Sequence, residues 1–152
     1  MAGYPVMQIK ISTKVQSGLE TVKAGFDSSL FMSLNPPFPP VRLLKFDGCK
    51  TGDEVALELN FLLFKQRWIS KITEDDEDEK SWEFVDEGYK LPFFLKQWKH
   101  HHQVKSIGSG SLIIDHIHFS TGYFLSDFIL WPALFFQFLY RKPVYKKRFK
   151  SQ

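Results

Sequence analysis

The pattern of hydrophobic and polar residues predicts a strand and then two short helices at the start of the chain. Apolar and polar side chains alternate through residues 5–15, which is the two-residue period of a half-buried strand. Residues 17–34 carry apolar side chains at helical spacing, interrupted at Gly25, and therefore predict two short helices. Pro36 ends them, because it disfavours a helical conformation at Asn35 and has no backbone N–H.

A series of strands is predicted after Pro40. The strand-like segments are separated by turn-forming residues and by one run of acidic residues. Their predicted bounds are 41–46, 54–63, 64–73, 80–86, 93–105 and 111–119. No internal repeat or linker divides the sequence, so a single domain of residues 1–152 is expected. A chain of this length buries about 70% of its unfolded surface, which is enough for an ordinary hydrophobic core.

The last part of the chain predicts a long apolar helix that starts at Ser126 and continues to the basic end. Ser126 is the expected N-cap, Asp127 suits the positive end of the helix, and Pro132 is expected to kink it. The stretch 123–140 approaches the length of a membrane span, but it contains Asp127, Pro132 and Gln137. Burial against a sheet is therefore preferred, with a membrane-surface or dimer contact as the alternative and no transmembrane segment expected.

Charge and composition narrow the function classes. The net charge is only +3, but residues 74–79 are all acidic and residues 141–150 carry six basic side chains and no acidic one. We interpret the acidic run as a solvated hairpin tip and the basic run as a helix C-terminus, and no nucleic-acid partner is expected because no nucleic-acid-binding motif accompanies the charge. Aromatic residues make up 16% of the chain, which suits a wide core or an aromatic-walled cavity.

The single cysteine, Cys49, excludes an internal disulfide. Residues 1–15 do not have the basic, apolar and small-residue order of a secretion signal, so a cytoplasmic location is the expectation. The motifs of serine hydrolases, nucleotide-binding loops and zinc ribbons are absent from the sequence.

The predicted order, one strand, two short helices, six strands and a long C-terminal helix, resembles the helix-grip fold of the START-like or SRPBCC superfamily. Local phrases strengthen the resemblance to bacterial ligand-binding members of that group. They are L-N-P-P at 34–37, G-D-E-V-A-L-E-L at 52–59, W-I-S-K-I at 68–72, F-V-D-E-G at 84–88, W-K-H-H-H at 98–102 and G-S-L-I-I-D-H-I-H-F at 110–119. In those bacterial proteins the corresponding sequence phrases are F-x-D, G-P-F, W-x-H-x-H and G-T-x-x-x-D. This chain departs from them at residues 90–93 and at Ser111.

The resemblance implies an α+β fold in which a curved seven-stranded antiparallel sheet wraps around the long C-terminal helix. Two short helices would lie between the first and second strands. The superfamily includes polyketide cyclases, lipid-transfer domains and the birch-pollen-allergen group, whose members bind, transport or convert apolar molecules in one cavity between sheet and helix. None of the matching phrases is a catalytic signature, so the resemblance implies a scaffold and only a broad function.

Four histidines are predicted on the inner wall of such a cavity. A hairpin that turns at Ser109 would pair His100 with His118 and His102 with His116. Lysines occupy the alternate positions of the first of these strands, so we take the histidine face as the interior. A slip of one residue would move histidines to the other face.

Three interpretations of the histidines stay open: a polar pocket lining, a role in ligand recognition or proton transfer, and a metal site. The metal site is the least favoured, because the sequence places no carboxylate or cysteine beside the imidazoles. Asp86 is expected to cap a turn, and Asp115 is expected to point away from the inner wall. No metal and no cofactor is therefore expected.

The preferred hypothesis is the binding, transport or sequestration of a hydrophobic small molecule by a monomer or homodimer. One alternative is a cyclase- or dehydratase-type enzyme that acts on a polyketide-like or aromatic substrate, with His100 or His102 as the general base. The sequence favours a binding protein over this enzyme. Another is a regulatory or membrane-peripheral interaction module. The predicted ligand-binding residues are Phe84, Phe94, Trp98, His100, His102, His116, His118, Phe128, Trp131, Phe135 and Phe138.

Overall fold

A computed structural model of the chain describes residues 5–151, so residues 1–4 and 152 of the predicted domain lie outside the described residues. Its core element is a seven-stranded antiparallel sheet with the strand order β1-β7-β6-β5-β4-β3-β2. The strands are β1 (Met7–Val15), β2 (Val41–Phe46), β3 (Glu54–Asn60), β4 (Lys65–Glu77), β5 (Ser81–Lys90), β6 (Gln97–Ile107) and β7 (Gly110–Ser120). The helices are α1 (Leu19–Ala24), α2 (Ser28–Ser33), α3 (Phe124–Leu139) and α4 (Arg141–Arg148).

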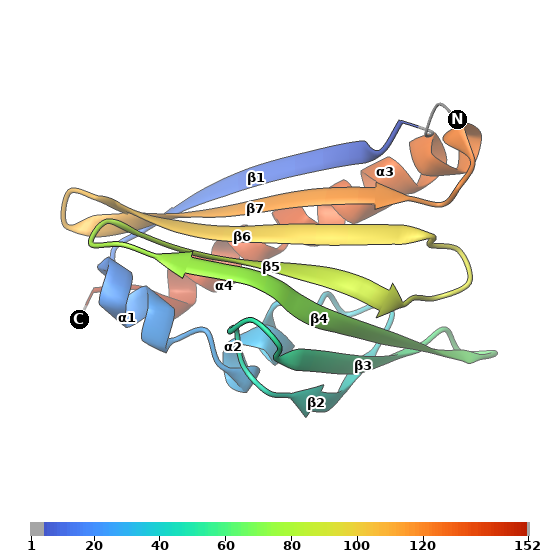
Figure 1. Cartoon of the computed structure of the whole chain (residues 1–152), viewed down its shortest axis with the longest axis horizontal. Helices are drawn as coiled ribbons and strands as arrows, with labels where there is room; N and C mark the ends of the chain where they lie inside the picture. Colours follow the sequence, from blue (N-terminus) through green and yellow to red (C-terminus); the bar gives the residue numbers. More distant parts are fainter. Residues whose placement is uncertain (1–4, 152) are drawn as a thin grey trace.

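This element order confirms the predicted α+β helix-grip fold. Figure 1 shows α3 and α4 crossing one face of the curved sheet, and α1 and α2 between β1 and β2 along the chain. The sheet faces follow the two-residue period of the strands: in β1 the odd-numbered Ile9, Ile11, Thr13 and Val15 are buried, and the even-numbered residues that alternate with them are exposed. The buried side of β1 and the helices therefore enclose the interior together.

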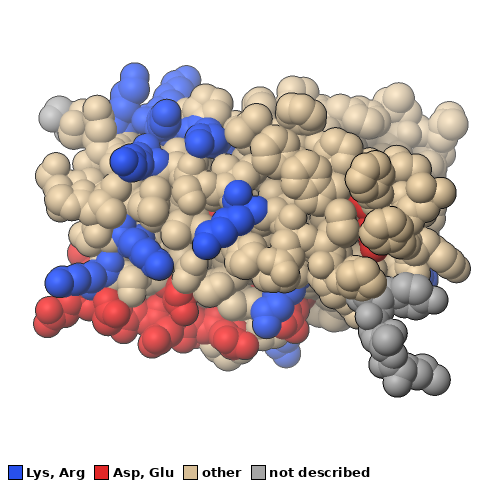
Figure 2. Space-filling model, turned by 90° about the horizontal axis from the view of Figure 1, so that it is seen from above, with Lys and Arg blue, Asp and Glu red and all other residues tan. Residues whose placement is uncertain are grey.

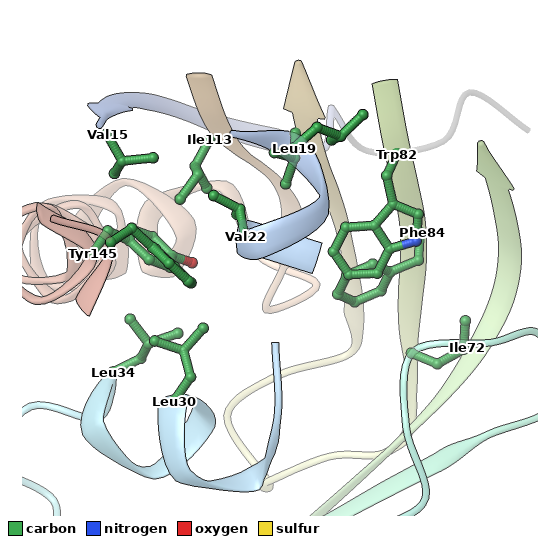
Figure 3. Packing of buried hydrophobic residues seen from close by; sticks show 12 residues of the cluster. Val15, Leu19, Val22, Leu30, Leu34, Ile72, Trp82, Phe84, Ile113 and Tyr145 are labelled. Atoms are coloured by element: carbon green, nitrogen blue, oxygen red, sulfur yellow. The ribbon is translucent and has the colours of Figure 1, made fainter. Parts of the chain in front are cut away.

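Two hydrophobic clusters hold the helices on the sheet. The first joins α1, α2 and α4 to the strands, and Figure 3 shows Tyr145 of α4 facing Val22, Leu30 and Leu34. The second joins α3 to β1, β6 and β7 through residues that include Leu134 and Phe138. The interior is thus packed at both places where helices meet the sheet.

The C-terminal helix differs in detail from the prediction. It begins at Phe124 rather than Ser126, and Asp127 is fully buried, where it accepts hydrogen bonds from the Oγ of Ser120 and the backbone N of Thr121. The helix is also divided at Tyr140 into α3 and α4. Pro143 accounts for the division, because without an N–H it cannot bond to the carbonyl four residues earlier.

The acidic run lies partly within a strand, which corrects its interpretation as a hairpin tip. Residues 74–77 belong to β4 and pair with β5, and the turn occupies residues 78–80. The Asp78 side chain accepts from the backbone N of Lys80 and of Ser81, at 2.7 and 2.8 Å. The carboxylates all remain exposed, so strand pairing of the backbone does not desolvate them. No helix of the described chain is long and apolar enough to cross a bilayer.

Candidate functional site

A cavity of about 390 Å³ lies between the concave face of the sheet and helices α2 and α3. Its walls are mostly apolar and aromatic, with contributions from α2, β2, β3 and α3 such as Leu30, Phe46, Leu57 and Leu134. The volume falls in the range of about 300 to 1,000 Å³ that holds small molecules in proteins. The interior is therefore hollow rather than completely filled by side chains.

The turn between β6 and β7 sets which side chains face this cavity. The loop consists of Gly108 and Ser109 only, because Ile107 pairs directly with Gly110. Gly108 has a φ of 59°, which is a conformation that glycine adopts without strain in two-residue hairpin loops. A turn centred on Ser109 was predicted, so the observed register differs from the prediction by one residue.

This register reverses the assignment of faces in β7. His100 lies opposite Ile117, and His102 lies opposite Asp115. His116 and His118 therefore lie on the outer face of the sheet and do not line the cavity, which corrects the predicted four-histidine wall.

Asp115, which was expected to point away, is 1% exposed and forms a buried cluster with Asp86 and the two inner histidines. His100 Nε2 lies 2.9 Å from Asp115 Oδ1, and His102 Nε2 lies 2.8 Å from Asp86 Oδ2. The two imidazole rings are close together, with centroids 3.5 Å apart. Asp86 is thus a hydrogen-bond partner of His102 rather than the predicted turn cap.

Two longer distances close the cluster into a ring of alternating imidazoles and carboxylates. His100 Nδ1 lies 3.7 Å from Asp86 Oδ2, and His102 Nδ1 lies 3.8 Å from Asp115 Oδ1. Each histidine therefore lies between the two carboxylates and makes a hydrogen bond to one of them. The Nδ1 of His102 is buried and has no hydrogen-bond partner within residues 5–151.

Arg141, at the start of α4, completes the cluster. Its NH1 lies 3.4 Å from Asp115 Oδ1, and its guanidinium lies 4.2 Å from the centre of the Phe138 ring. Burial raises the pKa of the neighbouring Tyr145, whose hydroxyl is fully buried. The sequence placed Arg141 only in the basic C-terminal end of the helix, because nothing along the chain shows that the first turn of α4 faces β7.

The electrostatics favour ionised carboxylates and a neutral His100. Burial, and then the adjacent His102, lower the pKa of His100 from 6.5 to about 4, although Asp115 opposes the shift. Burial acts to raise the pKa of Asp115, but the hydrogen bond from His100 and the charge of Arg141 hold it at about 2. Burial also acts to raise the pKa of Asp86, but the hydrogen bond from His102 and the neighbouring positive charges together lower it. Because an ionised carboxylate can only accept, His100 carries its proton on Nε2 at neutral pH.

The structure brings together six of the eleven predicted ligand-binding residues at the cavity wall: Phe84, Phe94, Trp98, His100, His102 and Phe138. Phe84 stacks on the His102 ring at 4.2 Å, and Phe138 meets the His100 ring edge-on at 5.1 Å. Aromatic side chains thus enclose the imidazoles.

The predicted residues of α3 divide between the cavity and its outside. Phe128 is 63% exposed, and Trp131 and Phe135 stack on each other at 5.0 Å, away from the cavity lining. The indole N–H of Trp131 donates to the backbone O of Gln8, which attaches α3 to β1. The helical period predicts the buried face of a helix only to within a residue or two. It therefore did not distinguish Phe128, Trp131 and Phe135, which lie outside the cavity, from Leu134 and Phe138, which line it.

Comparisons with known proteins show the fold but no closer relationship. No protein-family model matches the chain, and no curated protein matches its sequence. Among solved structures, the Zhui aromatase/cyclase from a Streptomyces species has a TM-score of 0.69 at 11% identity, over 92% of this chain and 91% of that one.

Two further structures have the same architecture. The di-domain aromatase/cyclase StfQ of the steffimycin biosynthetic pathway has a TM-score of 0.69 at 9% identity, over 95% of this chain and 51% of its own. Ara h 8.0201 has a TM-score of 0.57 at 11% identity, over 91% and 97%. The chain therefore adopts the helix-grip fold of the START-like proteins.

The buried cluster predicts that the folded protein becomes less stable as the pH is lowered. The unfolded chain binds a proton at His100 below pH 6.5, which the folded protein does not bind until about pH 4. The free energy of unfolding should therefore fall by roughly 3 kcal/mol as the pH is lowered from 6.5 to 4. Protonation of Asp115 should lower the free energy of unfolding further at still lower pH. Urea unfolding at a series of pH values, with a chelator present, measures this slope.

The matched control is His100→Gln, which removes the titrating group. The variant should be less stable at neutral pH, and its stability should depend less on pH between 4 and 6.5. The same pH slope in both proteins would show that His100 does not cause it.

Proposed function

We propose that the protein binds a hydrophobic small molecule in the cavity between the sheet and α3. The observation that carries this proposal is a hollow, mostly apolar interior with a polar region that includes Asp86, His100, His102 and Arg141. Apolar walls give affinity, and a few fixed polar groups orient a ligand. The fold supports the same proposal, because it is also the fold of proteins whose substrates or ligands are small molecules, such as the aromatase/cyclases.

The polar region defines the kind of ligand that fits. Arg141 offers N–H donors, and the carboxylate of Asp86 can accept a hydrogen bond. A flat or elongated apolar molecule with a carbonyl and a hydroxyl oxygen at one end meets both requirements.

Native mass spectrometry of the purified protein should show an apolar molecule at one per chain, which denaturing extraction would identify. A fluorescent fatty acid and an aromatic probe then measure binding directly. Leu57→Trp places an indole in the cavity and should lower probe affinity at least tenfold. Leu44→Trp is the matched control, because Leu44 lies on β2, is 40% exposed and does not line the cavity. An empty protein that binds neither probe would exclude this function.

A second candidate function is proton transfer to or from the bound molecule. The acid partner that such a reaction needs, and that the sequence did not identify, is supplied twice: Asp86 bonds to His102 and Asp115 bonds to His100. A carboxylate that orients an imidazole is a common arrangement in general acid–base catalysis.

Proton transfer predicts that the protein catalyses hydrogen exchange next to a carbonyl. The extracted ligand, or the bicyclic aromatic ketone α-tetralone, would be incubated with the protein in D₂O and followed by NMR. Deuterium should enter at the carbon beside the carbonyl, and His102→Gln should slow this by about 10²-fold or more. His116→Gln, which changes a residue on the outer face of the sheet, should not slow the exchange. Exchange at the rate of buffer alone would exclude the enzyme.

A peripheral membrane contact is supported by the outer face of α3. Leu125, Phe128, Ile129 and Phe136 are each more than 60% exposed, which is unusual for large apolar side chains on one helix. Lys146, Lys147 and Lys150 are exposed at the adjoining C-terminal end. Figure 2 shows a face of the molecule on which basic side chains gather toward one end and uncharged side chains fill much of the other. Apolar area beside basic charge complements an anionic bilayer.

Co-sedimentation with liposomes tests this contact. Binding to vesicles that contain phosphatidylserine should exceed binding to pure phosphatidylcholine, and should fall about fivefold for each of Lys146→Ala and Lys147→Ala. The double variant Phe128→Ser and Phe136→Ser should abolish it. Tyr89→Ser is the control for an exposed aromatic residue elsewhere. Equal binding to both kinds of vesicle would contradict the electrostatic part of the contact.

A further inference from the structure

The Asp86 side of the buried cluster has the donor atoms of a transition-metal site. Asp86, His100 and His102 each present one such atom, and the three atoms lie within 4.8 Å of one another. We propose that these three residues bind a divalent transition-metal ion of the zinc type on the cavity wall, with Asp115 as the residue that orients both imidazoles. Two imidazoles and one carboxylate are a common ligand set for zinc and for non-haem iron.

The distances suit a single ion. Ligand atoms at zinc bond lengths of about 2.0 to 2.2 Å in a tetrahedral arrangement lie roughly 3 to 4 Å from each other. His102 Nε2 lies 2.8 Å from Asp86 Oδ2, and His100 Nδ1 lies 3.7 Å from the same oxygen. Because all three atoms lie within 4.8 Å of one another, side-chain movements of about 1 Å or less would bring them into position.

Asp115 gives the arrangement that metal-binding histidines require. It accepts the hydrogen bond from His100 Nε2, so the lone pair of His100 lies on Nδ1, on the side of Asp86. A histidine that binds a metal through one nitrogen commonly donates its other N–H to a carboxylate, which fixes its tautomer and orientation. Asp115 does not line the cavity, whereas the three proposed ligands do. The ion would therefore face the cavity with Asp115 behind it.

The unpartnered Nδ1 of His102 fits the same arrangement. In the structure Nε2 bonds to Asp86, and Nδ1 is buried, 3.8 Å from Asp115 Oδ1 and without a hydrogen-bond partner in the described chain. Binding of the ion at Nε2 would displace the proton from that nitrogen, and Nδ1 would take up a proton and donate a hydrogen bond to Asp115. The ring stays neutral, and its buried polar atom gains a partner.

The charge of the cluster also favours a cation. Within the described chain, the buried carboxylate of Asp115 and the partly buried carboxylate of Asp86 lie close to one guanidinium, that of Arg141. Arg141 is close to Asp115, at 3.4 Å, and it lies beside the carboxylate that orients the ligands rather than the one that would bind the ion. A divalent ion would compensate the charge of Asp86, which has imidazoles as its nearest partners.

Three protein ligands leave a fourth position open toward the cavity. In zinc sites of this composition a water or a substrate oxygen takes that position. The inference does not rest on the proposed apolar ligand, because metal binding is measured with the metal alone.

Equilibrium dialysis of the metal-free full chain against Zn²⁺, with metal analysis, should give one ion per chain. Asp86→Asn and His102→Gln should each weaken binding at least tenfold, and Asp115→Asn should weaken it about 10- to 100-fold. The matched control is the double variant His116→Gln and His118→Gln, which removes two neighbouring histidines of the outer face, whose rings lie 4.4 Å apart. Circular dichroism checks that each variant folds.

Loss of binding in the outer-face double variant, with binding kept in His102→Gln, would show an adventitious surface site and overturn the proposal. No binding by the wild-type protein would also overturn it.

A measurement on the wild-type protein avoids the risk that a variant fails to fold. Nitrogen-15 NMR of the histidine rings distinguishes protonated from metal-bound nitrogens. Zn²⁺ should leave the His100 proton on Nε2 and move the His102 proton to Nδ1. Unchanged tautomers at saturating Zn²⁺ would exclude Asp86, His100 and His102 as the ligands.

Discussion

The geometry of the interior depends on the two-residue loop between β6 and β7. Because Gly108 adopts a positive φ, the hairpin closes with Ile107 opposite Gly110, and every pair along the two long strands follows from that contact. A loop one residue longer would exchange the two faces of β7, so Asp115 would point to solvent and His116 to the interior. The polar cluster thus exists because one glycine allows a tight turn some distance along the sheet.

The cluster also shows how charges can be tolerated in an apolar interior. Burial of a lone carboxylate costs several kcal/mol, and here each carboxylate accepts a hydrogen bond from an imidazole. The aromatic rings of Phe84 and Phe138 shield the pairs from solvent. Such a network adds little net stability compared with apolar packing, and a side chain removed from it leaves its partner unsatisfied. Groups of this kind at the wall of a cavity are typical of functional sites.

The sequence predicted the fold well because the fold follows from periodicity. The alternation in residues 5–15, the prolines after Asn35 and the apolar C-terminal segment are local signals, and they predicted the first strand, the end of the short helices and the C-terminal helical region, although that region is divided at Tyr140. The site was predicted only in part, since it depends on long-range register. His100, His102 and Trp98 were placed correctly on the cavity wall, whereas Asp86 and Asp115 become partners of the histidines only through pairings that a one-residue shift changes. Arg141 reaches the cluster because α4 packs against the sheet, and the hydrophobic pattern of the sequence does not indicate this packing.

The attachment of the C-terminal helix has a consequence for the order in which the molecule is assembled. The backbone N–H groups of Gln16 and Ser17, after the first strand, donate to the carbonyl of Phe149, and β1 pairs with β7, about a hundred residues away in the sequence. Contacts between such distant segments form slowly. During synthesis on the ribosome, the apolar side of the sheet must therefore stay uncovered until residues 124–149 have emerged, and chaperones are expected to bind the nascent chain in this state.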